Sequence, residues 1–136
     1  MVVEQFLQRA YYFDAPIHWV MGCDLPRNAT DTLPVEHLIG AACVLDCVQA
    51  AANPDYLLTH EALKAWESRH GRIPEHSWVL MRTDWSKLVA TPRYKNMDAS
   101  GQHTPGPTAA AIKFLIEERN IRGFGTETIG TDAGQA

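Results

Sequence analysis

The sequence predicts an α/β domain, because two strand patterns alternate with two helix patterns along the chain. Residues 41–48 and 78–85 are nearly continuous apolar runs, typical of buried strands, and the first predicts a strand buried on both faces. Residues 59–70 and 108–119 carry apolar side chains at helical spacing. A further short strand is expected within 121–128. This alternation is typical of α/β proteins.

Length and composition indicate one domain over residues 1–136. The chain is 46% hydrophobic and 21% charged, ordinary values for a globular protein. Its net charge of −4 offers no basic surface for nucleic acid or anionic membrane. No apolar run approaches the roughly 20 residues that span a bilayer, and the N-terminus lacks the pattern of a secretory signal. We therefore expect a cytoplasmic protein that binds neither nucleic acid nor membrane.

The first apolar run contains two of the three cysteines and one acid. Cys43 and Cys47 would lie about 13 Å apart on a strand, too far for a disulfide, so we expect reduced thiols. Cys23, in a loop, is the more accessible thiol, but no base lies near it in the sequence. Asp46 is either a functional carboxylate or, more commonly in such a position, an inward acid held by backbone N–H groups.

The helix expected at 59–70 has clear boundary signals. Thr59 is a good N-cap, and Gly71 is suited to ending the helix. The side chains expected to be buried are Ala62, Leu63, Ala65 and Trp66. His60 and His70 lie at opposite ends of this helix, so they are not expected to share a metal ion.

The second helix, 108–119, is capped by Thr108 in the same way. Its expected buried side chains are Ala111, Ile112, Leu115 and Ile116, and Glu117, Glu118 and Arg119 are expected to face water. Residues 86–107 have the composition of a long loop, and such loops often border a binding site. His103 is the titratable candidate for a site role there, although an exposed loop histidine is the more common outcome.

Arg82 and Asp84 share one face at the end of the second strand. This spacing favours a structural ion pair over a contact with substrate.

The strongest functional motif is at residues 13–19. Asp14 and His18 stand on either side of Pro16, between Phe13 and Trp19. Proline disfavours a straight central strand, so a bent segment can bring the carboxylate and the imidazole into one pocket. An Asp-led turn followed by a packed histidine would account for the same residues.

The motif also has a family resemblance. Asp14-Ala15-Pro16-Ile17-His18-Trp19, with Gly22, Asp24-Leu25-Pro26 and Gly40, resembles the Putative cyclase family of metal-dependent hydrolases, which includes kynurenine formamidases and isatin hydrolases. The stretch from His70-Gly71-Arg72-Ile73-Pro74 through Ser86, the helix at 108–119, and Gly123-Phe124-Gly125 with Thr126-Glu127-Thr128 are similar to the same family.

That resemblance, over roughly Phe13 to Asp132, implies a three-layer β/β/α fold of the swivelling-domain type, with both helices on one side of the strands. Compared with the family, we expect the fold to be truncated at both ends. Residues 1–12 are expected to form a divergent N-terminal segment.

The family signature is His-x-Gly-Thr-His followed by Asp-x-Pro-x-His. Asp14, Pro16 and His18 match its second half, whereas Gln8 and Tyr12 stand where the two histidines are expected. The resemblance implies that Asp14 is a metal ligand and His18 the acid/base catalyst. It also implies that Trp19 lines the pocket for a small aromatic amide-like ligand.

The donor set decides between the functional hypotheses. Catalytic zinc takes three protein ligands, and manganese needs several oxygens, so Asp14 alone is not a site. The remaining possible donors are Glu127, Asp132, His103 or a neighbouring subunit. We therefore expect no bound zinc or manganese, and favour a non-catalytic relative or a gene fragment. The alternative is an active hydrolase of cyclic or formyl amides rebuilt around Asp14 and His18, within one chain or across a subunit interface. We also expect a homo-oligomer that covers exposed strand edges.

Overall fold

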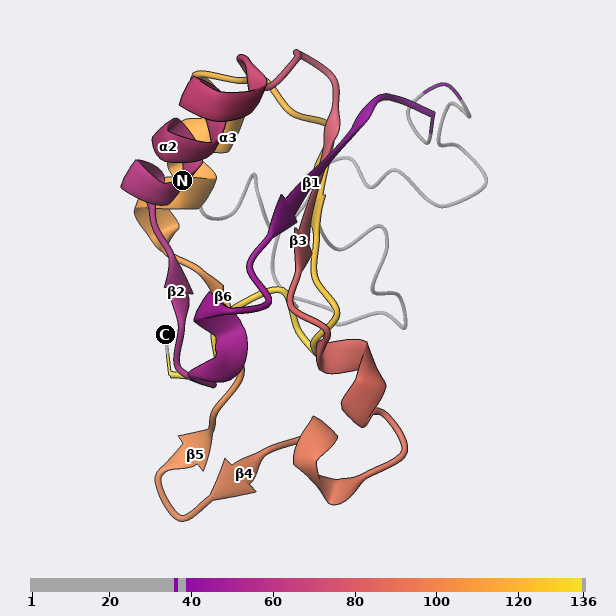
Figure 1. The fold of residues 1–136 in the computed structure, drawn as a ribbon, viewed down its shortest axis with the longest axis vertical. Coiled ribbons are helices and arrows are strands. Elements are labelled where there is room, and N and C mark those ends of the chain that lie inside the picture. Colours follow the sequence, from indigo (N-terminus) through magenta and orange to yellow (C-terminus); the bar gives the residue numbers. More distant parts are fainter. Residues whose placement is uncertain (1–35, 37–38, 136) are drawn as a thin grey trace, which may run out of the picture.

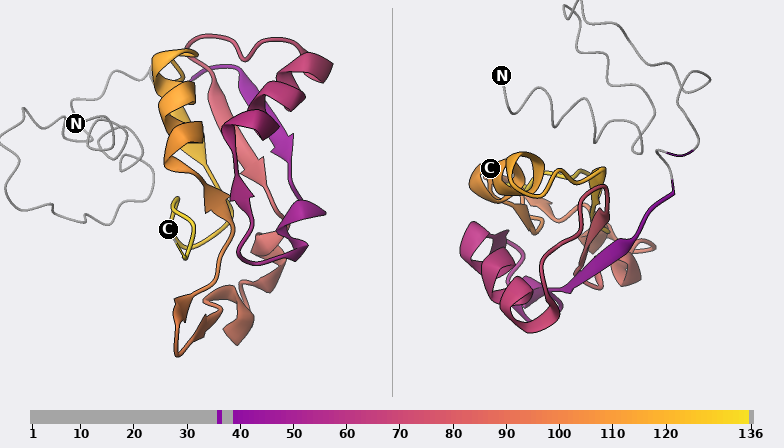
Figure 2. Two further views of the ribbon diagram at one scale, coloured as in Figure 1. Left: turned by 90° about the vertical axis from the view of Figure 1, so that its left-hand side faces the viewer. Right: turned by 90° about the horizontal axis from the view of Figure 1, so that it is seen from above.

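The computed structural model describes Glu36 and residues 39–135, which contain a parallel sheet covered on one face by two helices (Figure 1). The sheet consists of β1 (Ala42–Asp46), β3 (Trp78–Arg82) and β7 (Gly123–Gly125), in the order β1-β3-β7. The helices α2 (His60–His70) and α3 (Ala109–Glu117) lie side by side on the same side of this sheet (Figure 2). The expected α/β class and both expected helices are confirmed.

The core lies between the sheet and the helices. The sheet contributes Leu45, Val79, Met81 and Phe124, and Cys47 follows β1 directly. The helices contribute Leu63, Ala111, Ile112, Phe114 and Leu115. Leu63 and Leu115 are completely buried. Burying one such side chain stabilises the fold by roughly 1.5–3 kcal/mol. The helices are therefore held mainly by this apolar contact.

The prediction that β1 is buried on both faces is wrong. Leu45 is only 2% exposed, but its neighbour Val44 is 49% exposed, and Leu80 of β3 is 39% exposed. Val44 and Leu80 are aligned across the parallel pair, so both lie on the face that α2 and α3 do not cover. The apolar run alone could not show this, because burial depends on what packs against each face.

The helix boundaries follow the capping signals. The Thr59 hydroxyl accepts a hydrogen bond from the Ala62 N–H at 3.3 Å, and the Thr108 hydroxyl accepts one from Ala111 at 3.1 Å. Gly71 ends α2 with a φ of 90°, which a residue with a side chain rarely adopts. Of the side chains expected to be buried, Ala65 is exposed. None of the described helices is long and apolar enough to cross a membrane.

Arg119 was expected to face water, and this is wrong. Arg119 as a whole is only 8% exposed, and its guanidinium binds both carboxylate oxygens of Glu67, at 2.6 and 2.8 Å. The guanidinium also lies 4.2 Å from the centre of the Phe114 ring. Glu67 further accepts the Ile73 N–H at 2.9 Å. The residues just after α3 are thereby fastened to α2.

Residues 86–107 are not an open loop. They contain most of the 3-10 helix Trp85–Leu88, a second 3-10 helix at Pro92–Tyr94, the hairpin of β4 (Met97–Asp98) and β5 (Gly101–Gln102), and β6 (Gly106–Pro107). β6 pairs in parallel with β2 (Leu57–Leu58). Thr104 is 2% exposed and Pro105 is fully buried. The segment is therefore packed against the rest of the domain.

All three strands of the sheet are shorter than expected, and β1 covers Ala42–Asp46 where 41–48 was expected. β3 ends at Arg82 because Asp84 adopts a left-handed conformation with a φ of 59°, and Trp85 then begins a 3-10 helix. The strand expected within 121–128 is limited to Gly123–Gly125. Gly123 itself is required, because a Cβ there would lie 2.1 Å from the Trp78 ring.

Candidate functional site

Polar side chains gather where the parallel strands β1, β3 and β7 end. Asp46 ends β1, Arg82 ends β3, and Glu127 follows β7. In open α/β sheets, ligands bind outside the carboxyl ends of the strands. This edge of the sheet is therefore the candidate ligand site among the described residues.

An exposed ion-pair ladder occupies part of this edge. Arg82 contacts Asp46 at 3.2 Å and Asp84 at 3.1 Å, and Lys87 contacts Asp84 at 2.6 Å. The hydrogen bond from Lys87, followed by that from Arg82, lowers the pKa of the Asp84 carboxyl although desolvation opposes it. The predicted structural pair between Arg82 and Asp84 is thus confirmed.

Asp46 was expected to be either a functional carboxylate or an inward acid held by backbone N–H groups, and it matches neither description in full. Its side chain is 63% exposed, so it does not point into the core. One oxygen accepts the Val48 N–H at 3.2 Å, and the other faces Arg82. Asp46 is therefore a surface acid that closes a local turn and takes part in the ladder.

Glu127 is held at the same edge by three hydrogen bonds. One carboxylate oxygen accepts the Thr83 N–H at 2.6 Å and the Thr83 hydroxyl at 3.1 Å, and the other accepts the Ser86 hydroxyl at 2.8 Å. Burial acts to raise the pKa of this carboxyl, but the donors from Thr83 and Ser86 outweigh it and the pKa is lowered. Glu127 therefore ties the end of β7 to the end of β3.

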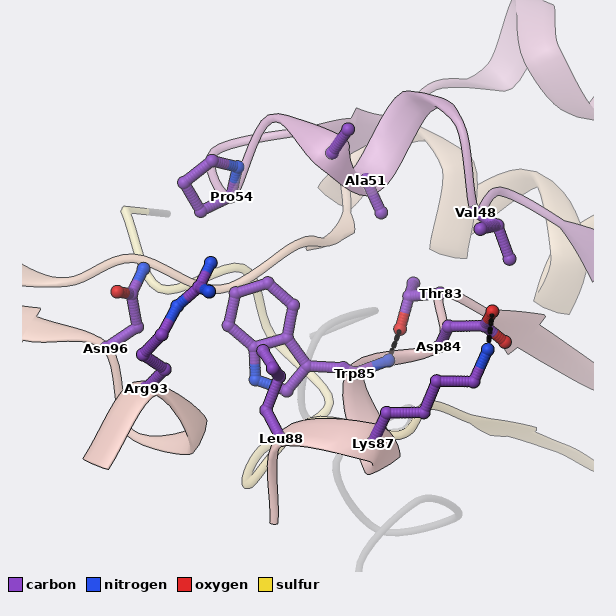
Figure 3. Close-up of a pocket in the computed structure, with 11 residues that line it drawn as sticks. Val48, Ala51, Pro54, Thr83, Asp84, Trp85, Lys87, Leu88, Arg93 and Asn96 are labelled. Atoms are coloured by element: carbon purple, nitrogen blue, oxygen red, sulfur yellow. Dashed lines mark hydrogen bonds and ion pairs between the residues drawn. The ribbon is translucent and has the colours of Figure 1, made fainter. Parts of the chain in front are cut away.

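A pocket of about 300 Å³ lies beside the ladder (Figure 3). Its apolar lining consists of Val48, Ala51, Ala52, Pro54, Trp85 and Leu88. The Trp85 indole is fixed, because its N–H donates to the Tyr94 carbonyl at 3.0 Å. Arg93 and Asn96 lie on one side of Trp85, and the ion pair of Asp84 and Lys87 lies on the other. No sequence motif indicated this pocket.

His103 lies in a polar cluster, not free in solvent. Its Nδ1 is 2.7 Å from Asp55, and its Nε2 is 2.9 Å from the Ser100 hydroxyl and 3.3 Å from Asp98. The hydrogen bond to Asp55, followed by the interactions with Asp98, raises the pKa of His103 against a smaller effect of desolvation. The hydroxyl and N–H of Ser100 are the main reasons that the pKa of Asp98 is lowered to about 2.

Ser100, His103 and Asp55 are connected in the same order as a Ser-His-Asp catalytic triad, but the arrangement does not suit nucleophilic catalysis. The Ser100 hydroxyl lies 2.6 Å from Asp98 and donates to it. A protonated imidazole between two carboxylates donates from both nitrogens, so it cannot accept the serine proton. The cluster instead fastens the β4–β5 hairpin to the loop at Asp55.

Neither described cysteine is part of a disulfide, as expected. Burial, with a smaller effect of Asp46, raises the pKa of the Cys47 thiol in spite of its hydrogen bond with Tyr56. Burial also raises the pKa of the Tyr56 phenol to about 12. Cys47 is therefore a protonated, packed side chain and no nucleophile. Cys23 lies outside the described residues.

The motif residues Asp14, His18 and Trp19 also lie outside the described residues, as do Gln8 and Tyr12. Within Glu36 and 39–135, no three His, Cys, Asp or Glu side chains come together to hold a metal ion. Glu127 and His103 are each bound to other side chains. Within the motif, the sequence offers one carboxylate and one imidazole as donors for the zinc or manganese ion implied by the resemblance, fewer than the three protein ligands that catalytic zinc takes.

Comparison with known proteins identifies the family of this chain and several relatives. The family described as Putative cyclase matches residues 8–133. The isatin hydrolase of Roseibium aggregatum is 49% identical over 127 residues, which are 92% of this chain and 48% of that protein. The chain thus spans about half the length of the curated relative that it matches.

The solved structures that resemble this chain are also isatin hydrolases. Isatin hydrolase A from Labrenzia aggregata, bound to benzyl benzoate, is 60% identical with a TM-score of 0.80, over 90% of this chain and 48% of that one. Isatin hydrolase A from Ralstonia solanacearum is 52% identical with a TM-score of 0.81, over 90% and 47%. An isatin hydrolase bound to the product analogue thioisatinate is 48% identical with a TM-score of 0.82, also over 90% and 47%. The cyclase-like α/β fold expected from the sequence is confirmed.

Proposed function

The chain belongs to the Putative cyclase family, and from this premise we propose that it is a small-ligand-binding relative of the isatin hydrolases that does not hydrolyse amides by itself. The observation that carries this proposal is the pair of substitutions at the start of the motif. Gln8 and Tyr12 replace both histidines that the family signature places before Asp14. The acid/base histidine, His18, and the neighbouring Trp19 are retained.

The physical chemistry of the donors supports this reading. A histidine has a pKa near 6.5, so at pH 7 it offers a neutral imidazole at almost no cost. A tyrosine has a pKa near 10, so forming its phenolate at pH 7 costs about 4 kcal/mol at 1.36 kcal/mol per pKa unit. A glutamine amide cannot supply a negative charge at all. Replacing two imidazoles with these groups leaves the carboxylate of Asp14 without comparable partners.

The retained residues can still bind and orient a ligand. The carboxylate of Asp14 can accept an amide N–H, and the imidazole of His18 can hold or move a proton at a carbonyl oxygen. The indole of Trp19 offers an aromatic contact. Relatives of known structure are bound to benzyl benzoate or to thioisatinate, which supports a small aromatic ligand for this chain.

Restoring the histidines tests the proposal. Wild type purified without chelator should contain far less than one zinc or manganese ion per chain by mass spectrometry of the metals. It should also leave isatin and N-formyl aromatic amides unhydrolysed. The double variant Gln8→His/Tyr12→His should bind zinc more tightly than wild type in a calorimetric titration. The matched control Gln5→His/Tyr11→His adds the same side chains outside the signature and should not.

One result would overturn the proposal. It is a stoichiometric metal ion in wild type, together with isatin hydrolysis that disappears in His18→Ala. The second candidate function, an active amide hydrolase, would then hold. It is favoured only by the retention of Asp14 and His18, and one way to complete its metal site is with donors from a second subunit. With such donors, its rate per chain would fall on dilution through the range in which light scattering shows dissociation.

The remaining expectations are part of the same proposal. They are a single domain over 1–136 with 1–12 as a divergent segment, a cytoplasmic location, a homo-oligomer, and no nucleic-acid partner. A stable monomer at micromolar concentration, measured by light scattering, would contradict the expected oligomer.

A further inference from the structure

The pocket beside the strand ends is lined by residues that lie outside the motif at 13–19. Its floor is the fixed indole of Trp85, which is 6% exposed, with Leu88, Ala51 and Pro54 around it. The volume of about 300 Å³ is at the lower end of the range for small-molecule sites. An apolar floor of this size suits one or two fused rings, not an extended chain.

The charges around the pocket are not balanced. Asp84 is the acid of the lining, and its carboxylate is already engaged by Lys87 at 2.6 Å and by Arg82 at 3.1 Å. Arg93 also lines the pocket, and its guanidinium has no ion pair or hydrogen bond with any described residue. A cation that pairs with none of the described residues therefore stands at the end of the pocket that is opposite the ladder.

These two features together define the ligand. We propose that this pocket binds a small aromatic carboxylate, with its ring on Trp85 and its carboxylate on the guanidinium of Arg93. A guanidinium binds a carboxylate through two parallel N–H donors, which fixes the plane of the ligand. A metal cation does not suit a pocket that carries Arg93 and Lys87, and an inorganic anion would leave the apolar floor in contact with water. The inference stands apart from the proposed function, because it uses no residue of the motif.

The probe is benzoate, titrated into the full chain by calorimetry and followed by the NMR shift of the Trp85 indole N–H. Arg93→Gln should weaken benzoate binding about tenfold, since a hydrogen-bonded charge is lost. The matched control is Lys95→Gln, which removes one charge from the end of the same 3-10 helix but is not part of the pocket lining. It should leave the affinity within about twofold. Benzamide, which lacks the charge, should bind at least tenfold more weakly than benzoate.

Several outcomes would overturn the inference. No benzoate binding at tens of millimolar would do so, as would equal losses in Arg93→Gln and Lys95→Gln. Formate binding as tightly as benzoate would show a simple anion contact and contradict the role of the floor. Binding that is lost in His18→Ala but kept in Arg93→Gln would place the ligand at the motif instead. Because Arg93 is exposed, its substitution should leave the unfolding midpoint unchanged, and this confirms that the variant is folded.

Discussion

Two ion-pair groups in this molecule have the same chemistry and opposite surroundings. Arg119 and Glu67 form a two-point pair in which the side chains are 10% and 12% exposed. Arg82 pairs with Asp46 and Asp84 at the strand ends, where its side chain is 49% exposed. Water screens the second group much more than the first, so the contact distances alone do not set the energies of the two groups. Burial therefore decides which of the two ion-pair groups stabilises the fold more.

The largest expected effect comes from breaking the buried pair. Arg119→Met should lower the free energy of unfolding by about 3 kcal/mol, because it leaves the Glu67 carboxylate buried without its partner. Urea denaturation measures this. Arg119→Met/Glu67→Gln should recover most of the loss, since no charge is then stranded and the amide oxygen can still accept the Ile73 N–H. A double variant as unstable as the single one would contradict this account.

Replacing Glu127 tests a carboxylate whose burial lies between that of the buried pair and that of the exposed ladder. It is partly buried and accepts from Thr83 and Ser86, so Glu127→Gln should cost about 1–2 kcal/mol in the free energy of unfolding. Glu117→Gln is the matched control, because Glu117 is exposed and its contact with Lys113 is 3.9 Å long. The control should change stability by less than about 0.5 kcal/mol. Equal effects in the two variants would show that the hydrogen bonds of Glu127 contribute little.

The exposed ladder should give a small and salt-dependent effect. Arg82→Met should cost less than about 1 kcal/mol in 0.1 M salt, and the cost should shrink further at about 1 M salt. Urea denaturation at both ionic strengths checks this. A loss of unfolding free energy as large as that in Arg119→Met would show that the exposed ladder stabilises the fold as much as the buried pair does.

The smallest effect is local and depends on pH. His103 has a raised pKa in the folded chain, so its contribution is fully present below the unfolded value of about 6.5 and is lost as pH rises through the folded value. Asp98, with a pKa of about 2, stays ionised throughout this change. Hydrogen-exchange protection of the His103 N–H, which donates to Asn96 at 2.9 Å, should therefore fall above neutral pH. In His103→Gln the protection should be lower and independent of pH over that range.

Local signals in the sequence were sufficient for part of the fold. Thr59 and Thr108 act on N–H groups three residues away, so both helix starts could be predicted. The pair of Arg82 and Asp84 is equally local. The face of β1 that stays open could not be predicted, because it depends on which side of the sheet the helices cover. The packing of residues 86–107 depends on the pairing of β6 with β2, which no local pattern reveals.

The candidate site divides in the same way. The residues predicted from the family resemblance, Asp14, His18 and Trp19, lie outside the described residues and stay predictions. The contacts of Glu127 join residues 41 and 44 positions apart, so the spacing of Thr83 and Ser86 gave no signal for them. The pocket around Trp85 is likewise made by separate segments, and only the folded chain shows that Arg93 stands beside it and pairs with no residue in the described part of the chain.

The protonated, shielded thiol of Cys47 has a practical consequence. Because alkylating reagents attack the thiolate, this sulfur should resist them while the chain is folded and react once the end of β1 separates from the helices. In a Cys43→Ser background lacking Cys23, the rate of modification would then time the opening of the domain without any added label.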